Sequence, residues 1–419
     1  MKSEHRTQNT EYRHLIKLFY LFFIFYLCSV LCALSSAHAK IYIDITSPAI
    51  RKLPVSFNFT GETEAAEITE IAKNDLDSTG IFHLLEPNIP GAEITVSINI
   101  NVSGEAVTAE VSVFDLIENN EVHRKKYEAA KNILRILAHS ISNDIFKAVT
   151  GHEGIFRTKL SYIVDASGKK ELHLMDWDGY NSHKIVAKGL TFSHSWSRDG
   201  VYIIYSSERD KEWSIYLMNL KNYRETVLFS SNGLNLAGNS SPDGNIAFSS
   251  SKDGSPEIYV MNADGTGSKK LTKSLGIDVS PVFSPDGSQI AFVSDRGGSP
   301  QIYIMNADGT GIRRLTFEGN YNTSPVWAPD GKQIAYVGRK NSNNQIFMVK
   351  LDTSEIRQLT DRGNNESPAF SPDGMFIAFD SDREKPKGIY VMRVNGEGLK
   401  KISPKGVKAI SPKWSPFLR

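Results

Sequence analysis

The chain has 419 residues, more than one ordinary domain needs and enough for two. Its composition is that of a soluble globular protein, with enough Gly and Pro to supply many turns. Lys and Arg number 48 against 47 Asp and Glu, and this near balance argues against nucleic acid as the main partner.

The first 39 residues have the layout of an export signal. Three basic side chains, Arg6, Arg13 and Lys17, precede an apolar run from Leu18 to Leu34, and the small-residue site Ala37-His38-Ala39 follows. This order predicts a secretory signal peptide over residues 1–39, cleaved after Ala39, with no membrane span in the mature chain. Because the apolar run is long for a signal, an uncleaved membrane anchor is the alternative.

Both cysteines, Cys28 and Cys32, lie in this segment. A lipoprotein site needs a small residue before the cysteine, and Leu27 and Leu31 are not small, so lipidation is not expected. The mature chain would then have a net charge of −1, because the segment carries four basic and two acidic residues. It would contain no disulfide and would be held together by packing alone.

Residues 40–155 are predicted to form a small α/β domain. Apolar residues alternate with polar ones over 55–59, 94–100 and 107–113, the period of half-buried strands. A first helix is expected over 65–76, with Gly80 as its stop. A second helix is expected to end at Gly151 and to bury Ile133, Ile136, Leu137, Ile141, Ile145 and Val149. Both helices should cover one face of a small sheet.

A repeat occupies residues 156–419. A strand of the form Ile-Tyr-x-Met starts at residues 215, 258, 302 and 389, with the variant Ile-Phe-Met-Val at 346 and a divergent copy at 172. The spacing of 43 or 44 residues is typical of a propeller blade of four short strands. Pro-Asp-Gly and Ala-Asp-Gly separate these strands, and both are turn sequences. The fold class predicted is mainly β: a six-bladed β-propeller preceded by the small α/β domain.

The two ends of the repeat array complement each other. The first copy lacks the Ser-Pro-x-Phe strand that begins the later ones, and the chain finishes on such a strand at residues 411–416. We therefore expect the C-terminal strand to close the ring and to leave no exposed sheet edge.

Sequence signatures of catalysis or metal binding are missing. The chain has no Gly-x-Ser-x-Gly, no His-Glu-x-x-His and no Gly-rich phosphate loop before a helix. Asp176-Trp177-Asp178-Gly179 resembles the start of a calcium loop, but Ala187 stands where the loop needs Glu, so a turn is expected. Asp295-Arg296 and Asp382-Arg383 fit either partner contacts or local ion pairs. The sequence predicts no enzyme, no cofactor and no metal.

The repeat Ser-Pro-Asp-Gly, Ile-Ala-Phe, Ile-Tyr-x-Met-Asn-x-Asp-Gly, Leu-Thr resembles that of the TolB family of bacterial propeller proteins. The family layout also matches: an export signal, an α/β domain, six repeats and a C-terminal Ser-Pro-Lys-Trp-Ser-Pro. The resemblance implies a monomeric, periplasmic, non-enzymatic component of the Tol–Pal system, which maintains the outer membrane and draws it inward during division. It implies two partners, the lipoprotein Pal and TolA, and leaves room for other outer-membrane proteins.

The resemblance places Pal at the propeller face where the first strands begin. The residues expected there are Phe192, Leu236, Asp278, Val279, Asn322, Thr323, Asn365 and Glu366, with Arg296, Arg339 and Arg383 in neighbouring loops. It places TolA on the mature N-terminus, Lys40, Ile41, Tyr42, Ile43 and Asp44. This alternating segment could add to an exposed sheet edge, or it could be the first strand of its own domain.

Two other functions fit the same repeat. Propellers of this kind occur in some serine peptidases, so a degenerate or regulatory peptide-binding propeller is the first alternative. A propeller that binds a small ligand or sugar is the second, and it would need a deep pocket with convergent polar groups.

Overall fold

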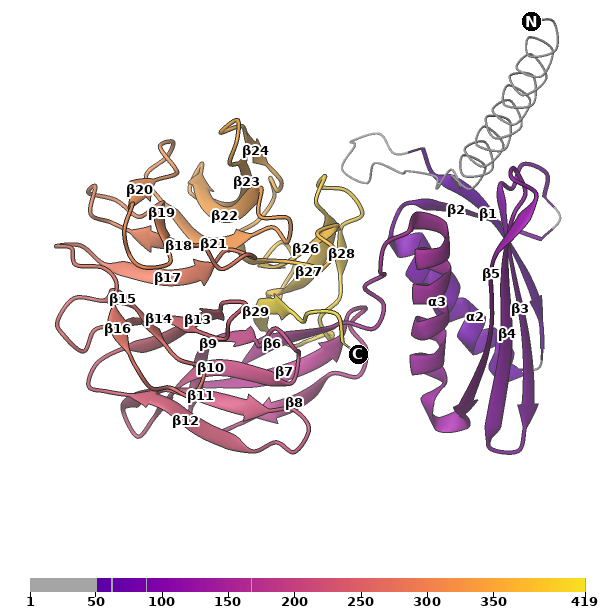
Figure 1. The fold of residues 1–419 in the computed structure, drawn as a ribbon, viewed down its shortest axis with the longest axis horizontal. Helices are drawn as coiled ribbons and strands as arrows, with labels where there is room; N and C mark the ends of the chain where they lie inside the picture. The colour runs from indigo at the N-terminus through magenta and orange to yellow at the C-terminus, as the bar shows by residue number, and fades with distance from the viewer. Residues whose placement is uncertain (1–50, 62, 88, 167, 419) are drawn as a thin grey trace, which may run out of the picture. The chain divides into compact units, whose positions relative to one another are not determined.

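The structure, a computed structural model, describes residues 51–418 apart from residues 62, 88 and 167. The fold is mainly β, as predicted, with a small α/β part followed by a six-bladed β-propeller (Figure 1). The predicted signal peptide, residues 1–39, lies outside the described residues.

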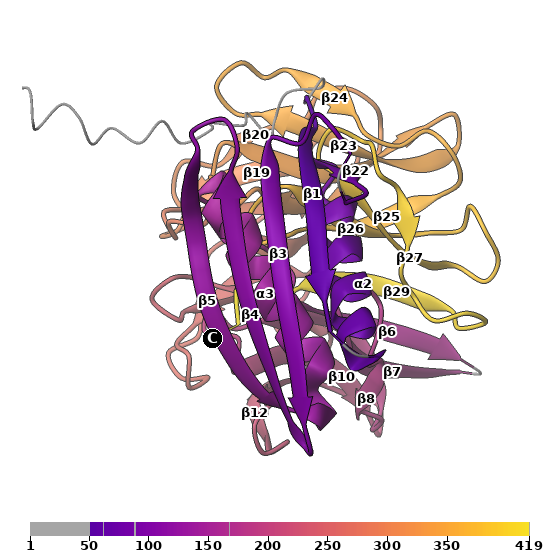
Figure 2. The same ribbon diagram turned by 90° about the vertical axis from the view of Figure 1, so that its right-hand side faces the viewer.

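The α/β part is built on a five-stranded sheet of order β2-β1-β3-β4-β5. Its strands are β1 (Leu53–Thr60), β2 (Phe82–Leu85), β3 (Ile94–Ser103), β4 (Ala106–Asp115) and β5 (Asn120–Ala130). Strand β1 pairs in parallel with β2 and β3, and β3, β4 and β5 are antiparallel to one another. Figure 2 shows β5, β4, β3 and β1 side by side.

Two helices cover one face of this sheet, as expected: α2 (Thr63–Ser78) and α3 (Leu134–Thr150) (Figures 1 and 2). A short 3-10 turn, η1 (Lys131–Ile133), leads into α3. Helix α3 ends at Gly151, whose φ of 78° is left-handed and whose N–H donates to the carbonyl of Lys147. A residue without Cβ adopts this conformation at little cost, which is why the glycine marks the end.

Two details of this part differ from the prediction. Ile136 is 58% exposed and Ile133 lies in η1, so neither belongs to the buried face of α3, which includes Phe146 instead. Strand β5 was not predicted, because it is an edge strand with one buried side chain, Tyr127, and shows no alternation of apolar residues.

The propeller contains six four-stranded blades, each described from its innermost strand outward. Blade 1 consists of β29 (Ala409–Trp414), β6 (Lys159–Ala166), β7 (Lys169–Asp176) and β8 (His183–Val186). Blade 2 consists of β9 (Leu190–Trp196), β10 (Tyr202–Arg209), β11 (Glu212–Asn219) and β12 (Glu225–Ser230). Blade 3 consists of β13 (Asn235–Ser240), β14 (Ile246–Ser250), β15 (Glu257–Met261) and β16 (Lys269–Lys270).

The remaining blades repeat this pattern along the chain. Blade 4 consists of β17 (Asp278–Phe283), β18 (Gln289–Ser294), β19 (Gln301–Asn306) and β20 (Arg313–Arg314). Blade 5 consists of β21 (Asn322–Trp327), β22 (Gln333–Lys340), β23 (Asn343–Lys350) and β24 (Ile356–Gln358). Blade 6 consists of β25 (Asn365–Phe370), β26 (Phe376–Ser381), β27 (Gly388–Arg393) and β28 (Lys400–Lys401).

The six innermost strands form a closed ring. Each one contacts the innermost strand of the next blade, and β29 contacts both β25 and β9. Strand β29 is antiparallel to β6, with Ala409 opposite Val164 and Trp414 opposite Leu160. Blade 1 is therefore assembled from strands at the two ends of the propeller segment of the chain.

The repeated residues fill the space between blades. The aromatic residues of the second and third strands lie against each other within a blade, with ring centroids 5.5 Å apart for Phe248 and Tyr259 and 6.1 Å apart for Phe379 and Tyr390. The alanine of each Ile-Ala-Phe strand, for example Ala291, is fully buried. This framework holds the first strands and their loops in place around the axis.

Candidate functional site

The residues predicted for Pal lie together at one end of the propeller, but three of their side chains are buried. Asp278, Asn322 and Asn365 are 0%, 3% and 0% exposed and occupy the first position of β17, β21 and β25. Because these side chains are buried, a partner bound at this end of the propeller would contact the residues around them instead.

The buried amides join adjacent blades. Gln301 of blade 4 accepts hydrogen bonds at Oε1 from Asn322 of blade 5, at 2.8 Å, and from Thr316, at 2.7 Å. Gln345 of blade 5 does the same with Asn365 of blade 6 and with Thr360, at 2.9 and 2.8 Å. A buried amide that finds all its partners stabilises a single arrangement, so these contacts fix the blades relative to each other.

Between blades 3 and 4 two acids replace the two amides. Glu257 accepts a hydrogen bond from Thr272 at 2.7 Å, and Asp278 pairs with Arg296 at 2.7 Å. Both carboxyls are buried, at 3% and 0% exposure. Burial raises the pKa of Asp278, although Arg296 acts in the opposite direction, and the nearby Glu257 adds to the rise.

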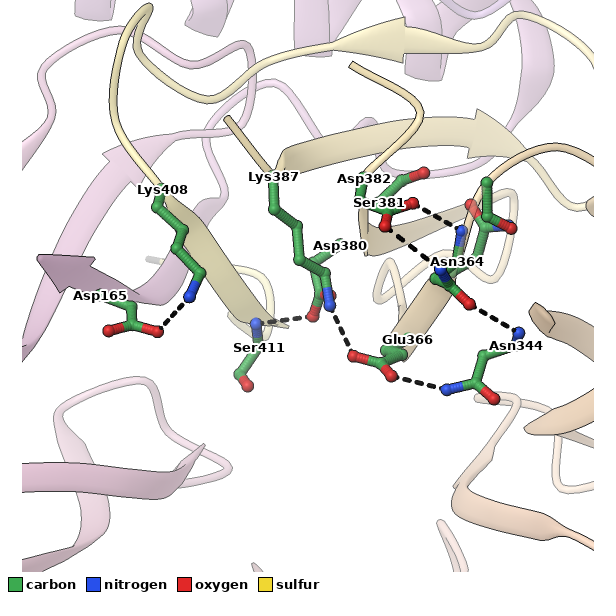
Figure 3. Close-up of polar contacts among 12 residues, drawn as sticks. Asp165, Asn344, Asn364, Glu366, Asp380, Ser381, Asp382, Lys387, Lys408 and Ser411 are labelled. Atoms are coloured by element: carbon green, nitrogen blue, oxygen red, sulfur yellow. Dashed lines mark hydrogen bonds and ion pairs between the residues drawn. The ribbon is translucent and has the colours of Figure 1, made fainter. Parts of the chain in front are cut away.

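Glu366 is the partly exposed acid of the predicted set, and it belongs to a polar chain that crosses blade boundaries (Figure 3). It accepts from Asn344 Nδ2 at 2.6 Å and pairs with Lys387 Nζ at 2.5 Å. Lys387 also pairs with Asp380 at 2.5 Å, and Asp380 accepts from the backbone N–H of Ser411 at 2.9 Å. The chain ties blades 5 and 6 to the closing strand.

The predicted arginines make local contacts. Besides the pair of Arg296 with Asp278, Arg383 donates to Asn365 Oδ1 at 2.9 Å, and Arg339 lies 4.1 Å above the centre of the Tyr321 ring. The carboxylates of Asp295 and Asp382 accept from backbone N–H groups of the loops before β17 and β25. Among the described residues neither Asp295-Arg296 nor Asp382-Arg383 forms an ion pair within itself, because Arg296 pairs with Asp278 and Arg383 with an amide.

Four further predicted residues are partly exposed at this end of the first strands: Phe192, Leu236, Val279 and Thr323. Phe192 is held on two sides, by the ring of Trp213 with centroids 4.6 Å apart and by Lys170 at 4.2 Å from its ring centre. It is a fixed apolar surface beside the opening of the channel.

Sequence reasoning missed the most exposed apolar side chains of this end. Leu275 and Ile277, before β17, are 106% and 47% exposed, and Phe317, before β21, is 71% exposed. They lie in the loops that lead into first strands, next to predicted residues. The available signal was a large apolar residue shortly before or after a glycine in a loop, as at Leu275-Gly276-Ile277, but the repeat motif describes only the strands.

The ring of first strands encloses a channel along its axis. Its volume is about 460 Å3, and residues of all six first strands line it, among them the Ser-Pro segments of blades 4, 5 and 6. The lining includes Phe192 and Leu236, so the channel opens at the end described above.

The remaining predicted sites lie outside the propeller end described above. Lys40 to Asp44, predicted for TolA, lie outside the described residues. Residues 176–179 form the expected turn, closed by the N–H of Gly179 and the carbonyl of Asp176 at 2.9 Å. In the described part of the chain, Asp75, His139 and Asp178 each bring one ligand atom within 4.8 Å of the others, but Arg135 already pairs with Asp178.

Comparison with known proteins identifies relatives over most of the chain. A family model described as the TolB beta propeller domain matches residues 146–418. The Tol-Pal system protein TolB of Methylobacillus flagellatus is 30% identical over 247 residues, which cover 53% of this chain and 57% of the relative. That of Desulfosudis oleivorans is 33% identical over 227 residues, which cover 47% and 52%. The chain spans about half the length of the curated relatives it matches.

Solved structures extend the likeness to the α/β part. The crystal structure of TolB from Acinetobacter baumannii has a TM-score of 0.80 and 27% identity, and covers 88% of this chain and 97% of that one. A nidogen/laminin complex structure, at 12% identity and a TM-score of 0.52, shares the fold alone. Among the described residues, no helix has the length and apolar character needed to cross a membrane. The family model, the named relatives and the matching structure agree, and the chain belongs to the TolB β-propeller family.

Proposed function

We propose that this chain is a non-enzymatic, periplasmic component of the Tol–Pal system that binds Pal at the end of the propeller where the first strands begin. Its role would be to maintain the outer membrane and to support its invagination during cell division. Family membership and the names of the curated relatives support the Tol–Pal assignment.

One observation supports this end of the propeller as the surface that binds Pal. Leu275, Ile277 and Phe317 expose apolar surface in neighbouring loops, before the first strands of blades 4 and 5. The held ring of Phe192 lies at the same end of the propeller, in blade 2. Apolar side chains gathered at one end of a soluble protein mark an interaction surface, and aromatic anchors contribute most to such contacts. Glu366 and Arg339 add polar groups around them, as in the rim of a protein interface.

The test is the affinity of Pal for a double variant, Leu275→Asp with Phe317→Asp. Both side chains are exposed, so the thermal midpoint should not change, while the dissociation constant should rise about tenfold or more. Isothermal titration calorimetry with purified Pal measures it. Asp278→Lys is unsuitable, because it would replace the buried partner of Arg296 by a second positive charge.

The matched control is Tyr223→Asp. Tyr223 is 54% exposed in the turn between β11 and β12, at the opposite end of the blades, and its φ of 54° suits Asp. This variant should bind Pal like the parent chain. An unchanged dissociation constant in the double variant would show that Pal binds elsewhere.

We also propose that Lys40–Asp44 bind TolA by adding a strand to a sheet edge of that partner. Deleting residues 40–44 should then abolish TolA binding in a pull-down and leave the affinity for Pal unchanged. Retained TolA binding would contradict the assignment. Loss of both partners together would instead indicate that the segment is needed for folding.

A further inference from the structure

The channel has two chemically different halves. The residue after each Ser-Pro pair, or at the matching position, lines the channel in every repeat. In blades 4, 5 and 6 it is apolar: Val282, Val326 and Ala369. In blades 1, 2 and 3 the corresponding residues are Lys413, Ser195 and Asn239. Since β29, β9 and β13 are neighbours in the ring, their polar side chains share one side of the channel.

The charges that line the channel are all positive. Arg198 and Lys413 are among the lining residues, and no Asp or Glu is. Among the described residues the ammonium of Lys413 has no ion pair within 4.0 Å; the nearest acid that influences it, Asp380, pairs with Lys387 instead. Burial lowers the pKa of Lys413, and the attraction of Asp380 offsets this effect only in part.

Unused hydrogen-bonding groups lie beside this lysine. The hydroxyls of Ser193 and Ser195 are buried without a partner. His194 lies between these two serines, is 2% exposed, and hydrogen-bonds to the backbone of Ser161 in blade 1. Trp196 Nε1 donates to the backbone carbonyl of Lys413 at 3.2 Å, so β9 and β29 are locked together at this point.

We propose that the polar half of the channel binds a small oxyanion, a carboxylate or a phosphate, with Lys413 as its counter-ion and the hydroxyls of Ser193 and Ser195 as hydrogen-bond donors. A metal cation does not fit, because the ammonium would repel it and the lining offers no carboxylate. A volume of about 460 Å3 is that of a small-molecule site. The site is separate from the exposed loops assigned to Pal, so it does not depend on that function.

The physical reason is the set of unpaired groups. A buried ammonium without a counter-charge and buried donors without acceptors both raise the free energy of the folded state. An oxyanion would compensate the charge and accept several of these hydrogen bonds at once. Burial lowers the pKa of His194 to about 3, so its ring is neutral near pH 7 and does not itself supply a charge to the anion.

The experiment measures the thermal midpoint of the purified chain with increasing inorganic phosphate or acetate, against sodium chloride at the same ionic strength. Either oxyanion should raise the midpoint above the chloride series, by saturable binding to the native state. A larger effect of phosphate would identify a phosphate site, and a larger effect of acetate a carboxylate site. If neither exceeds chloride, the proposal is wrong.

Lys413→Met assigns the effect to the channel. It removes an uncompensated charge and keeps the length of the side chain, so the variant should fold at least as well as the parent chain while its apparent affinity falls about tenfold or more. Lys405→Met, at an exposed lysine in the loop before β29, is the control and should bind like the parent. Ser195→Ala should weaken binding by a smaller factor. Unchanged affinity in both Lys413→Met and Ser195→Ala would overturn the proposal.

Discussion

Asp278 shows how one side chain can depart from a repeated structural role. Its counterparts in blades 5 and 6 are Asn322 and Asn365, whose amides need no counter-charge. In blade 6, Arg383 donates to the amide oxygen of Asn365 much as Arg296 donates to Asp278. An asparagine therefore fits this position and keeps its arginine contact.

We predict that Asp278→Asn stabilises the protein at neutral pH. Burial raises the pKa of Asp278, so the folded state favours the protonated acid and its stability falls as the pH rises through that pKa. The variant lacks this penalty. Its thermal midpoint should lie about 2–4 °C above the parent at pH 7, and the gain should shrink as the solution becomes acidic.

The reverse exchange, Asn365→Asp, is the matched control. It places an acid in a fully buried site beside Gln345, and should destabilise the protein most at neutral pH. Differential scanning calorimetry over a pH series measures both variants. A gain for Asp278→Asn that is equal at all pH values would contradict the role of the buried charge.

At the scale of single residues, the sequence alone predicted only part of the candidate site. Polar residues at the start of a strand are expected at the surface, and that is why Asp278, Asn322 and Asn365 were predicted to meet a partner. Their burial depends on Gln301, Gln345 and Glu257 of the preceding blades, which come close only in the folded ring. No spacing within one repeat reveals such a contact.

At the scale of the element, strand β29 depends on Trp414. The side chain is 7% exposed, its Nε1 donates to Thr158 Oγ1 at 2.8 Å, and its ring lies 6.4 Å from that of Phe376 in blade 6. One residue thus connects the last strand to the beginning of blade 1 and to blade 6.

Trp414→Ala should lower the free energy of unfolding by about 3–5 kcal/mol, because it leaves a cavity and removes the hydrogen bond to Thr158. Phe417→Ala, three residues later and 38% exposed, should change it little. Urea unfolding followed by circular dichroism measures both. If the two variants unfold at the same urea concentration, β29 does not contribute to the stability of the ring.

Elements differ in how well the sequence predicts them. The strands that carry Ile-Tyr-x-Met or Ile-Ala-Phe are buried on both faces and recur, so their pattern is strong. The outermost strands β16, β20 and β28 have two residues each, and β5 is a polar edge strand. The positions of these strands depend on pairing with a neighbouring strand, and the sequence of a short polar segment does not predict that pairing.

At the scale of the whole molecule, the repeat gives the ring and the exceptions to the repeat give its chemistry. The constant residues are buried between blades, whereas Lys413, His194 and Asp278 stand where other blades have apolar or amide residues. The period therefore predicts the architecture well. The candidate sites required the folded positions, because residues such as Lys413 and His194 are more than two hundred positions apart in the sequence.

The placement of β29 also bears on how the protein is made. This strand is the last of the propeller to be synthesised, yet it is the innermost strand of the first blade. Strand β6 therefore keeps an unpaired edge until synthesis is complete, and such an edge invites pairing with other chains. A chain that stops before Ala409 would keep that edge permanently. Completion of synthesis thus becomes a condition for a non-aggregating product, and incomplete chains would be ready substrates for proteases.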